Sequence, residues 1–143
     1  MKHVLIIDDE KSLLFSIKKG FEPFSDEVTI LTAENGLEAL AVLEAQDVDL
    51  VVTDLKMPEM DGVEVARRVR NFDPNIVTII ITGYATVEAA IEAMKRGAYD
   101  FIPKPFEPDQ LRIVVNRAAE KIRLSREAEL LGVPLDVRAG MPL

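Results

Sequence analysis

Five short apolar segments alternate with segments of helical periodicity, and this alternation constrains the fold more than any other feature of the sequence. The apolar segments are Val4–Ile7, Val28–Leu31, Leu50–Thr53, Ile76–Ile81 and Tyr99–Ile102. Most of them lack the alternation of polar and apolar residues that is typical of a strand with one solvent-exposed face. A run that is apolar throughout is typical of a strand buried on both sides in a parallel sheet. The pattern therefore predicts the α/β class.

Between these segments, hydrophobic residues recur at intervals of three and four, as Leu13, Leu14, Ile17 and Phe21 do after the first segment. Such spacing places them on one face of a helix. Strands joined by helices pair in parallel through right-handed crossovers. For five strands we expect a flavodoxin-like, doubly wound, five-stranded parallel sheet of order 2-1-3-4-5, with an extended C-terminal helix.

Polar residues follow four of the expected strands. In this strand order the first and third strands are neighbours, and ligands of such sheets bind beyond their carboxyl ends. The first strand is followed by Asp8 and Asp9, and the third by Asp54. The fourth strand ends at Thr82, and Lys104 follows the fifth. Three carboxylates, a hydroxyl and an ammonium group are therefore expected at one edge of the sheet.

Three adjacent carboxylates repel one another and raise one another's pKa unless a cation neutralises them. The chain has no cysteine, and His3 is its only histidine, so an all-oxygen site is expected. Such ligands favour Mg2+, with Mn2+ as the other possibility. A divalent cation together with Lys104 could neutralise a phosphoryl group, and the central Asp54 is the candidate nucleophile that would become an aspartyl phosphate.

Four motifs in this order resemble the receiver domains of two-component response regulators. The motifs are Ile7–Glu10, Thr53–Gly62, Thr82–Gly83 and Lys104–Phe106, within a resemblance that runs from Lys2 to about Lys121. Each motif is weak alone, but all four stand in the family's order at strand ends. The resemblance implies a phosphoacceptor domain that responds to a sensor histidine kinase.

The resemblance also implies roles for residues near the metal. Asp54 would be the phosphoacceptor, and it would ligate Mg2+ directly together with Asp9. Asp8 would hold a metal-bound water, and the backbone carbonyl of Lys56 would be the third protein ligand. The side chains of Lys56 and Tyr84 occupy positions that set the dephosphorylation rate in the family.

Further roles concern the switch itself. Lys104 would contact a phosphoryl oxygen, and the Lys104–Pro105 bond resembles one that is cis in the family. Thr82 would donate its hydroxyl to the phosphoryl group. Phe101 occupies the position of the switch aromatic, which would pack inward when Thr82 moves. The domain would thus assist chemistry on itself, without acting as an enzyme on another substrate.

The segment Ile81–Ile91 is similar to receivers of the nitrogen-regulatory class. Receivers of that class usually precede an ATPase domain and a DNA-binding domain. They dimerise through the fourth helix, fifth strand and fifth helix. The resemblance therefore implies a homodimer that uses this surface, and a role in transcription regulation through an output domain.

The last helix is expected from Pro108 to about Leu131, a length of roughly 35 Å. The expected organisation is a receiver at 1–122, an extension of the last helix at 123–131 and a disordered tail at 132–143. The heptad pattern of the extension is imperfect, so a linker and a dimerisation helix both remain open. The same holds for a fragment of a longer regulator and a stand-alone receiver that acts through a partner protein.

The formal net charge of -8 argues against direct nucleic-acid binding by this segment, because DNA and RNA backbones would repel it. No apolar run reaches the length of a membrane span, and the N-terminus lacks the form of a signal peptide. No membrane contact is therefore expected, and the expected compartment is the cytoplasm.

Three other classes of protein share parts of the pattern. A phosphohydrolase of the haloacid-dehalogenase type needs a second Asp two residues after the nucleophile, where this chain has Lys56. A flavodoxin-like FMN carrier needs a hydroxyl- and glycine-rich loop where this chain has Asp8–Glu10. A non-phosphorylated scaffold receiver would not need Asp54, Thr82 and Lys104 together. Mg2+-dependent labelling separates this last alternative from a working receiver.

Overall fold

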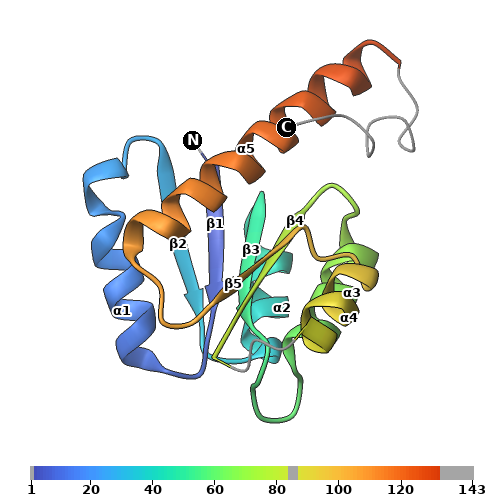
Figure 1. The fold of residues 1–143 in the computed structure, drawn as a ribbon. Helices are drawn as coiled ribbons and strands as arrows, with labels where there is room; N and C mark the ends of the chain where they lie inside the picture. Colours follow the sequence, from blue (N-terminus) through green and yellow to red (C-terminus); the bar gives the residue numbers. More distant parts are fainter. Residues whose placement is uncertain (1, 84–86, 133–143) are drawn as a thin grey trace.

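The computed structural model describes residues 2–83 and 87–132, which form one parallel sheet with helices on both faces (Figure 1). The elements are β1 (Lys2–Ile7), α1 (Lys11–Gly20), the 3-10 helix η1 (Glu22–Phe24), β2 (Val28–Ala33), α2 (Gly36–Ala45), β3 (Leu50–Asp54), α3 (Gly62–Phe72), β4 (Val77–Thr82), α4 (Val87–Lys95), β5 (Asp100–Pro103) and α5 (Pro108–Leu130). The sheet order is β2-β1-β3-β4-β5, and every pairing is parallel. The predicted fold class is confirmed.

Element boundaries differ from the sequence prediction at a few positions. The backbone N–H of Ile76 donates to Asp73 in a turn, so β4 begins one residue later than expected. The last strand, β5, includes Pro103, which an edge strand tolerates because one side of its backbone pairs with no strand. The short helix η1 was not expected, and Pro23 occupies its first turn.

Apolar side chains fill the space on each side of the sheet. On one face, α1 and α5 cover a core formed by alternate residues of the strands. Its largest fully buried members include Val4, Ile6, Leu50, Ile79, Ile81 and Leu111. On the other face, α2, α3 and α4 cover Leu5, Ile7, Val51 and Ile80 with their neighbours. Both faces of the central strands are therefore buried, as their continuous apolar runs predicted.

Two helices begin at side chains that cap them. The Asn35 side chain accepts a hydrogen bond from the N–H of Glu38 at 2.9 Å, and Glu38 in turn accepts from the N–H of Glu34 at 2.8 Å. Asn35 is thus the N-cap of α2, and Glu38 ties the preceding residue to the first turn of the helix. Asp61 accepts from the N–H of Glu64 at 2.9 Å and so starts α3. The second cap fixes the end of the loop that follows the central strand β3.

The last helix runs across one face of the sheet and continues beyond it (Figure 1). The Arg126 guanidinium in this continuation contacts the Asp49 carboxylate at 2.8 Å, and the same carboxylate accepts from the N–H of His3 at 2.9 Å. Leu130 is 88% exposed at the end of the helix. The tail predicted at 132–143 lies, from residue 133 onward, outside the described residues. No helix of residues 2–83 and 87–132 is long and apolar enough to cross a bilayer.

Candidate functional site

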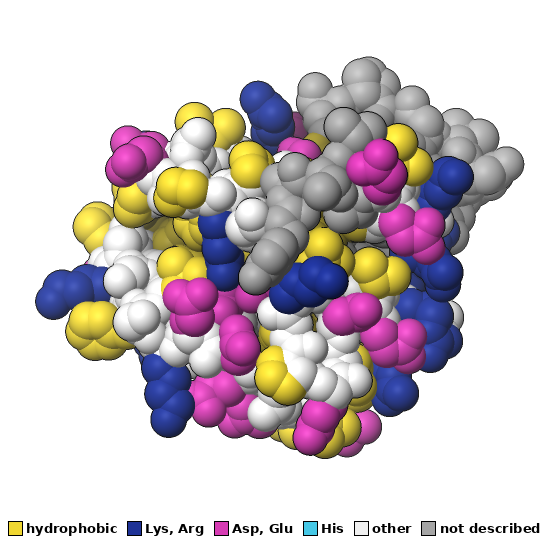
Figure 2. Space-filling view, turned by 60° about the horizontal axis from the view of Figure 1, so that its bottom comes forward, with side chains coloured by type: hydrophobic (Ala, Val, Ile, Leu, Met, Phe, Trp, Pro, Cys, Tyr) yellow, Lys and Arg dark blue, Asp and Glu magenta, His cyan; other side chains and the backbone are white. Residues whose placement is uncertain are grey.

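The carboxyl edge of the sheet brings together the acidic residues that follow β1 and end β3. Parallel pairing sets Ile7 beside Thr53 and Asp54 beside Ile81, so that Asp8, Asp54 and the end of β4 lie at one level. Figure 2 turns this edge toward the viewer and shows acidic side chains gathered on it. The strand order thus produces the juxtaposition expected from the sequence.

The three carboxylates lie in different environments. Asp8 is completely buried and Asp54 is 6% exposed, whereas Asp9 is exposed. One carboxylate oxygen from each of the three lies within 4.8 Å of the others. Thr82, at the end of the neighbouring strand, is also completely buried. Two buried acids and one exposed acid therefore form a cluster that is open to solvent on the side of Asp9.

Lys104 reaches into this cluster from the loop after β5. Its Nζ lies 2.9 Å from Asp8 Oδ2, 3.4 Å from Asp54 Oδ2 and 3.9 Å from Glu10 Oε1. The backbone N–H of Lys104 donates to the carbonyl of Thr82 at 2.8 Å, and the Lys104–Pro105 bond is cis. The Lys104 ammonium thus neutralises part of the charge of the Asp8, Asp54 and Glu10 carboxylates.

Burial is the largest cause that raises the pKa of Asp54 above its usual range, and the charge of Asp8 raises it further. The ammonium of Lys104 and a hydrogen bond from the backbone of Lys56 oppose this rise without cancelling it. For Lys104, burial alone would lower the pKa, but the hydrogen bond and charge of Asp8, with Asp54 and Glu10, raise it. Lys104 is therefore cationic at neutral pH, and its single charge leaves the cluster negative.

The loop between β3 and α3 packs closely against the backbone of Asp54. A Cβ atom placed on Gly62 would lie 2.3 Å from the carbonyl oxygen of Asp54, and the N–H of Gly62 donates to the carbonyl of Leu55 at 2.8 Å. Within the loop, Glu59 has a left-handed backbone with a φ of 69°. The Lys56 side chain is exposed while its backbone N–H bonds to the Asp54 carboxylate. The loop thus fixes the backbone of the candidate nucleophile.

Phe101 lies in β5, on the face covered by α4. Its half-buried ring packs against a small core of Leu55, Ile80, Ala93 and Ala98, together with Val63. This core connects the loop after β3 with α4, so a shift at the acidic edge has a direct packing route to the ring. Tyr84, for which a rate-setting role was expected, lies outside the described residues.

The contacts that Glu10 and Gly62 make in the site are not predicted by the sequence. The carboxylate of Glu10 faces Lys104, and the N–H of Glu10 donates to Asp8 Oδ1 at 2.9 Å, which fixes the Asp8 side chain. Gly62, which lacks a Cβ, lets the start of α3 approach the backbone of Asp54 closely. An Asp-Gly pair before a helical pattern signals a cap or turn, but it does not reveal which backbone the glycine approaches.

The donor set suits a hard divalent cation. All three side chains offer carboxylate oxygens, and the residual negative charge left by Lys104 is what such a cation would neutralise. The exposed position of Asp9 leaves room for water, which Mg2+ retains in most protein sites. The cluster therefore has the chemistry of a magnesium site.

Adding Mg2+ is expected to raise the melting temperature of the chain, because an ion bound only by the folded state stabilises that state. At a hundredfold excess over the dissociation constant the gain is about 2.7 kcal/mol, or roughly 8 °C for a chain of this size. Differential scanning fluorimetry would measure it. Asp9→Asn should remove most of the rise, while Asp26→Asn, at an exposed acid elsewhere, should retain it. Equal rises in both variants would contradict the site.

Comparison with known proteins adds independent information. The family model described as the response regulator receiver domain matches residues 4–116. The transcriptional regulatory protein ZraR of Klebsiella oxytoca is 35% identical over 125 residues, which are 85% of this chain and 27% of that protein. The C4-dicarboxylate transport transcriptional regulatory protein DctD of Rhizobium meliloti is 36% identical over 141 residues, which are 98% of this chain and 30% of that protein.

A solved structure agrees with these relatives. The beryllofluoride-activated NtrC4 receiver domain dimer, determined in solution, superposes with a TM-score of 0.79 at 33% identity and covers 85% of this chain and 99% of that chain. The resemblance drawn from the four motifs, including its likeness to the nitrogen-regulatory class, is confirmed by these matches. The chain spans less than a third of the length of the two curated relatives.

Proposed function

Because this chain belongs to the response regulator receiver domain family, we propose that it accepts a phosphoryl group from a sensor histidine kinase onto Asp54. Mg2+ is the proposed cofactor, with Mn2+ as a substitute. The observation that carries the proposal is the placement of a buried carboxylate of raised pKa beside one ammonium group and two further acids. The domain would be residues 1–122, with 123–131 as an extension of its last helix.

The chemistry of transfer falls to Asp54. One of its carboxylate oxygens attacks phosphorus while the P–N bond of the donor phosphohistidine breaks and the bonding electrons remain with the imidazole. The product is an acyl phosphate on Asp54 and a free histidine on the kinase. Hydrolysis later returns the carboxylate and inorganic phosphate. The domain therefore turns over only its own modification and acts as no enzyme on another substrate.

The neighbouring residues prepare this step. Lys104, with its Nζ already 3.4 Å from Asp54, would contact a phosphoryl oxygen. Bound Mg2+ would supply the positive charge that attracts the phosphoryl oxygens and offsets the repulsion among the acids. Asp9, Asp54 and the carbonyl of Lys56 would hold the cation directly, and Asp8 would hold it through water.

The switch would pass from the acidic edge to the surface of α4, β5 and α5. A phosphoryl group on Asp54 would draw the buried hydroxyl of Thr82 toward it, and the half-buried ring of Phe101 would follow inward. Phosphorylation would act by favouring one of two existing conformations, since it makes better contacts in one of them. The Lys56 side chain and Tyr84 would set the lifetime of the modified state.

The output of the switch would be a homodimer or a contact with an output domain in transcription regulation. Exposed apolar side chains already lie on the relevant helices, with Ile91 49% exposed, Met94 46% and Ile113 51%. The related NtrC4 receiver has been solved as an activated dimer. We propose the cytoplasm as the compartment, and no direct contact of this segment with nucleic acid or membrane.

Incubation with acetyl phosphate and Mg2+ is expected to add the mass of one phosphoryl group to the chain, as measured by intact mass spectrometry. The adduct should disappear when Mg2+ is chelated. Asp54→Asn should give none, because its amide is a poor nucleophile, whereas Asp61→Asn, which alters only a helix cap, should still be labelled.

Light scattering on the same samples would locate the output. Dimer formation on labelling supports the surface of α4, β5 and α5 as the homodimer interface. Labelling with an unchanged mass in solution would assign the output to a partner protein, as in a stand-alone receiver. An unlabelled wild type under all these conditions would refute the phosphoacceptor function and leave the scaffold alternative.

A further inference from the structure

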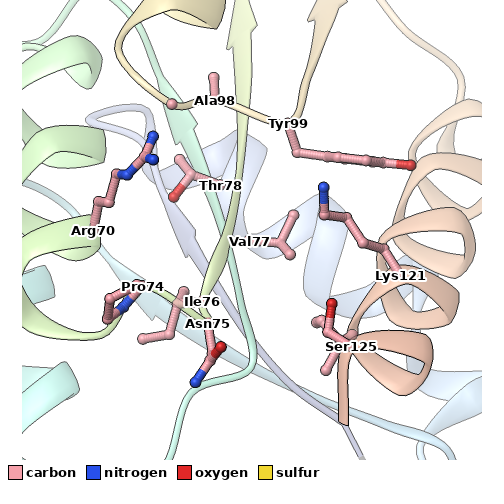
Figure 3. A pocket seen from close by; sticks show the side chains of 12 residues that line it. Arg70, Pro74, Asn75, Ile76, Val77, Thr78, Ala98, Tyr99, Lys121 and Ser125 are labelled. Carbon is pink, nitrogen blue, oxygen red and sulfur yellow. The ribbon is translucent and has the colours of Figure 1, made fainter. Parts of the chain in front are cut away.

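A cavity lies at the opposite edge of the sheet from the acidic cluster, where β4 begins. It has a volume of about 260 Å³, and Figure 3 shows it from close by. The last turn of α3, the turn before β5 and the middle of α5 form its walls. We propose that this cavity binds a small organic anion, a carboxylate or phosphate ester with a short apolar body. The proposal is independent of phosphorylation at Asp54.

The register of the short strand β5 creates the cavity. Asp100, the first residue of β5, pairs with Ile79 of β4, so Val77 and Thr78 extend past the end of the edge strand. The residues Gly97–Tyr99 turn into β5 across this gap, with the N–H of Tyr99 bonded to the carbonyl of Thr78 at 2.6 Å. The flanking helices continue alongside, so a hollow remains between them that the sheet does not fill.

The charge of the cavity is opposite to that of the chain. The described lining contains two cationic side chains, Arg70 and Lys121, and no carboxylate, although the chain carries a formal net charge of -8. In Figure 3 the two cations approach the space from opposite walls, Arg70 from α3 and Lys121 from α5. A small anion between them would be attracted from both sides.

Arg70 lines the cavity and forms no ion pair or side-chain hydrogen bond with a described residue. Most other described arginines pair with a carboxylate, namely Arg67, Arg68, Arg96, Arg112, Arg123 and Arg126. Arg70 instead lies against Gly97, where an added Cβ would come within 2.5 Å of Nη1. Arg70 is exposed at the rim of the cavity, and no described residue uses the bidentate donor capacity of its guanidinium.

A buried hydroxyl supports the same conclusion. Thr78 is 4% exposed and lines the cavity, and its side chain forms no hydrogen bond with a described residue. Buried hydroxyl groups normally have a partner, and an acceptor inside the cavity would supply one for Thr78. An anionic oxygen is such an acceptor. On the other wall, the Lys121 ammonium lies over the Tyr99 ring, 5.1 Å from its centroid, in a cation–π contact.

The apolar part of the lining defines the rest of the ligand. Ile76, Val77, Ala98 and Ile122 contribute hydrophobic surface between the polar groups. The volume lies below the range of about 300–1,000 Å³ that is typical of sites for drug-sized ligands. The ligand is therefore a small metabolite-sized acid with one apolar group, rather than a nucleotide or a peptide.

The test is an NMR titration of the full chain in Mg2+-free buffer with benzoate, with phenyl phosphate and with the neutral isostere benzamide. Benzoate or phenyl phosphate should shift the amide resonances of Arg70, Gly97–Tyr99 and Lys121–Ser125 to saturation, with a dissociation constant of about 1 mM or lower. The tighter of the two identifies a carboxylate or a phosphate ligand. Benzamide should bind at least about tenfold more weakly.

Matched variants distinguish binding in the cavity from nonspecific attraction of anions to the surface. Arg70→Gln and Lys121→Gln should each weaken binding about tenfold or more. Arg123→Gln removes the same charge from α5, at a residue already paired with Glu120 and Glu127, and should leave binding unchanged. Equal weakening in all three variants, scattered shifts that do not saturate, or equal binding of benzamide would each overturn the proposal.

Discussion

Replacing Lys104 with methionine is expected to destabilise the folded chain by about 3 kcal/mol near neutral pH when no divalent cation is present. Methionine retains the length of the side chain but removes the charge that lies 2.9 Å from Asp8 and 3.4 Å from Asp54. Both acids are almost fully buried, so their carboxylates would remain in the interior without a cation. Removal of one partner from a buried ion pair is costly for this reason.

The effect should depend on pH in a direction set by the pKa shifts. Lys104 has a raised pKa, so its stabilising contribution is complete below the ordinary pKa of an ammonium and is lost only as the pH rises through the raised value. Asp54 also has a raised pKa, so the folded state binds its proton more tightly than the unfolded state. Without Lys104 this difference grows, and acidification from neutral pH toward the ordinary carboxyl range should recover part of the lost stability.

Urea unfolding at about pH 7.5 and about pH 5.5, with and without Mg2+, would measure these effects. Mg2+ should also restore part of the stability, because it supplies positive charge to the same carboxylates. Lys11→Met is the matched control, since Lys11 is 81% exposed and its ion pair among the described residues is with Glu34 at the surface. A Lys104→Met variant as stable as this control at both pH values would show that the ammonium does not offset the buried acids.

Replacing Leu111 with alanine is expected to destabilise the chain by about 2–5 kcal/mol, which corresponds to a fall in melting temperature of roughly 10 °C. Leu111 is 1% exposed and belongs to the core between α5 and the sheet. Its truncation would leave a cavity against residues of several strands that cannot collapse independently. The penalty therefore combines lost burial with an unfilled space.

Ile113, two residues further along the same helix, provides the control. It is 51% exposed, so Ile113→Ala should change the free energy of unfolding by less than about 1 kcal/mol. Calorimetry would compare the melting temperatures of the two variants, each of which replaces one α5 residue with alanine. Similar losses in the two variants would mean that α5 is not docked on the sheet through the face that contains Leu111.

Much of this architecture could be predicted because its signals are local. Apolar runs define the central strands, and the acids that follow them reach one edge as soon as the strand order is known. The two faces of the sheet follow from alternation, as at Leu5 and Ile6, which enter different cores. The four motifs and the strand order together predict Asp54 and Lys104 at one site, and Lys104 Nζ lies 3.4 Å from Asp54 Oδ2.

The parts that could not be predicted depend on register and on contacts between distant segments. The cavity that contains Arg70 and Lys121 exists because β5 begins opposite Ile79, and composition does not reveal that register. The left-handed backbone of Glu59 occurs at a residue type that does not signal it. The pairing of Arg126 with Asp49 similarly joins two ordinary surface residues whose proximity only the docked helix creates.

The packing of α5 also has a consequence for the order in which a ribosome makes the chain. The helix carries Leu111, Val115 and Ile122 into the core that also contains Val4 of β1, the strand that precedes the other four of this sheet along the chain. Until its codons have been translated, one face of the sheet has no cover at its centre and its apolar side chains face water. A nascent chain therefore contains every acid of its carboxyl edge long before it contains the helix that closes the sheet behind them.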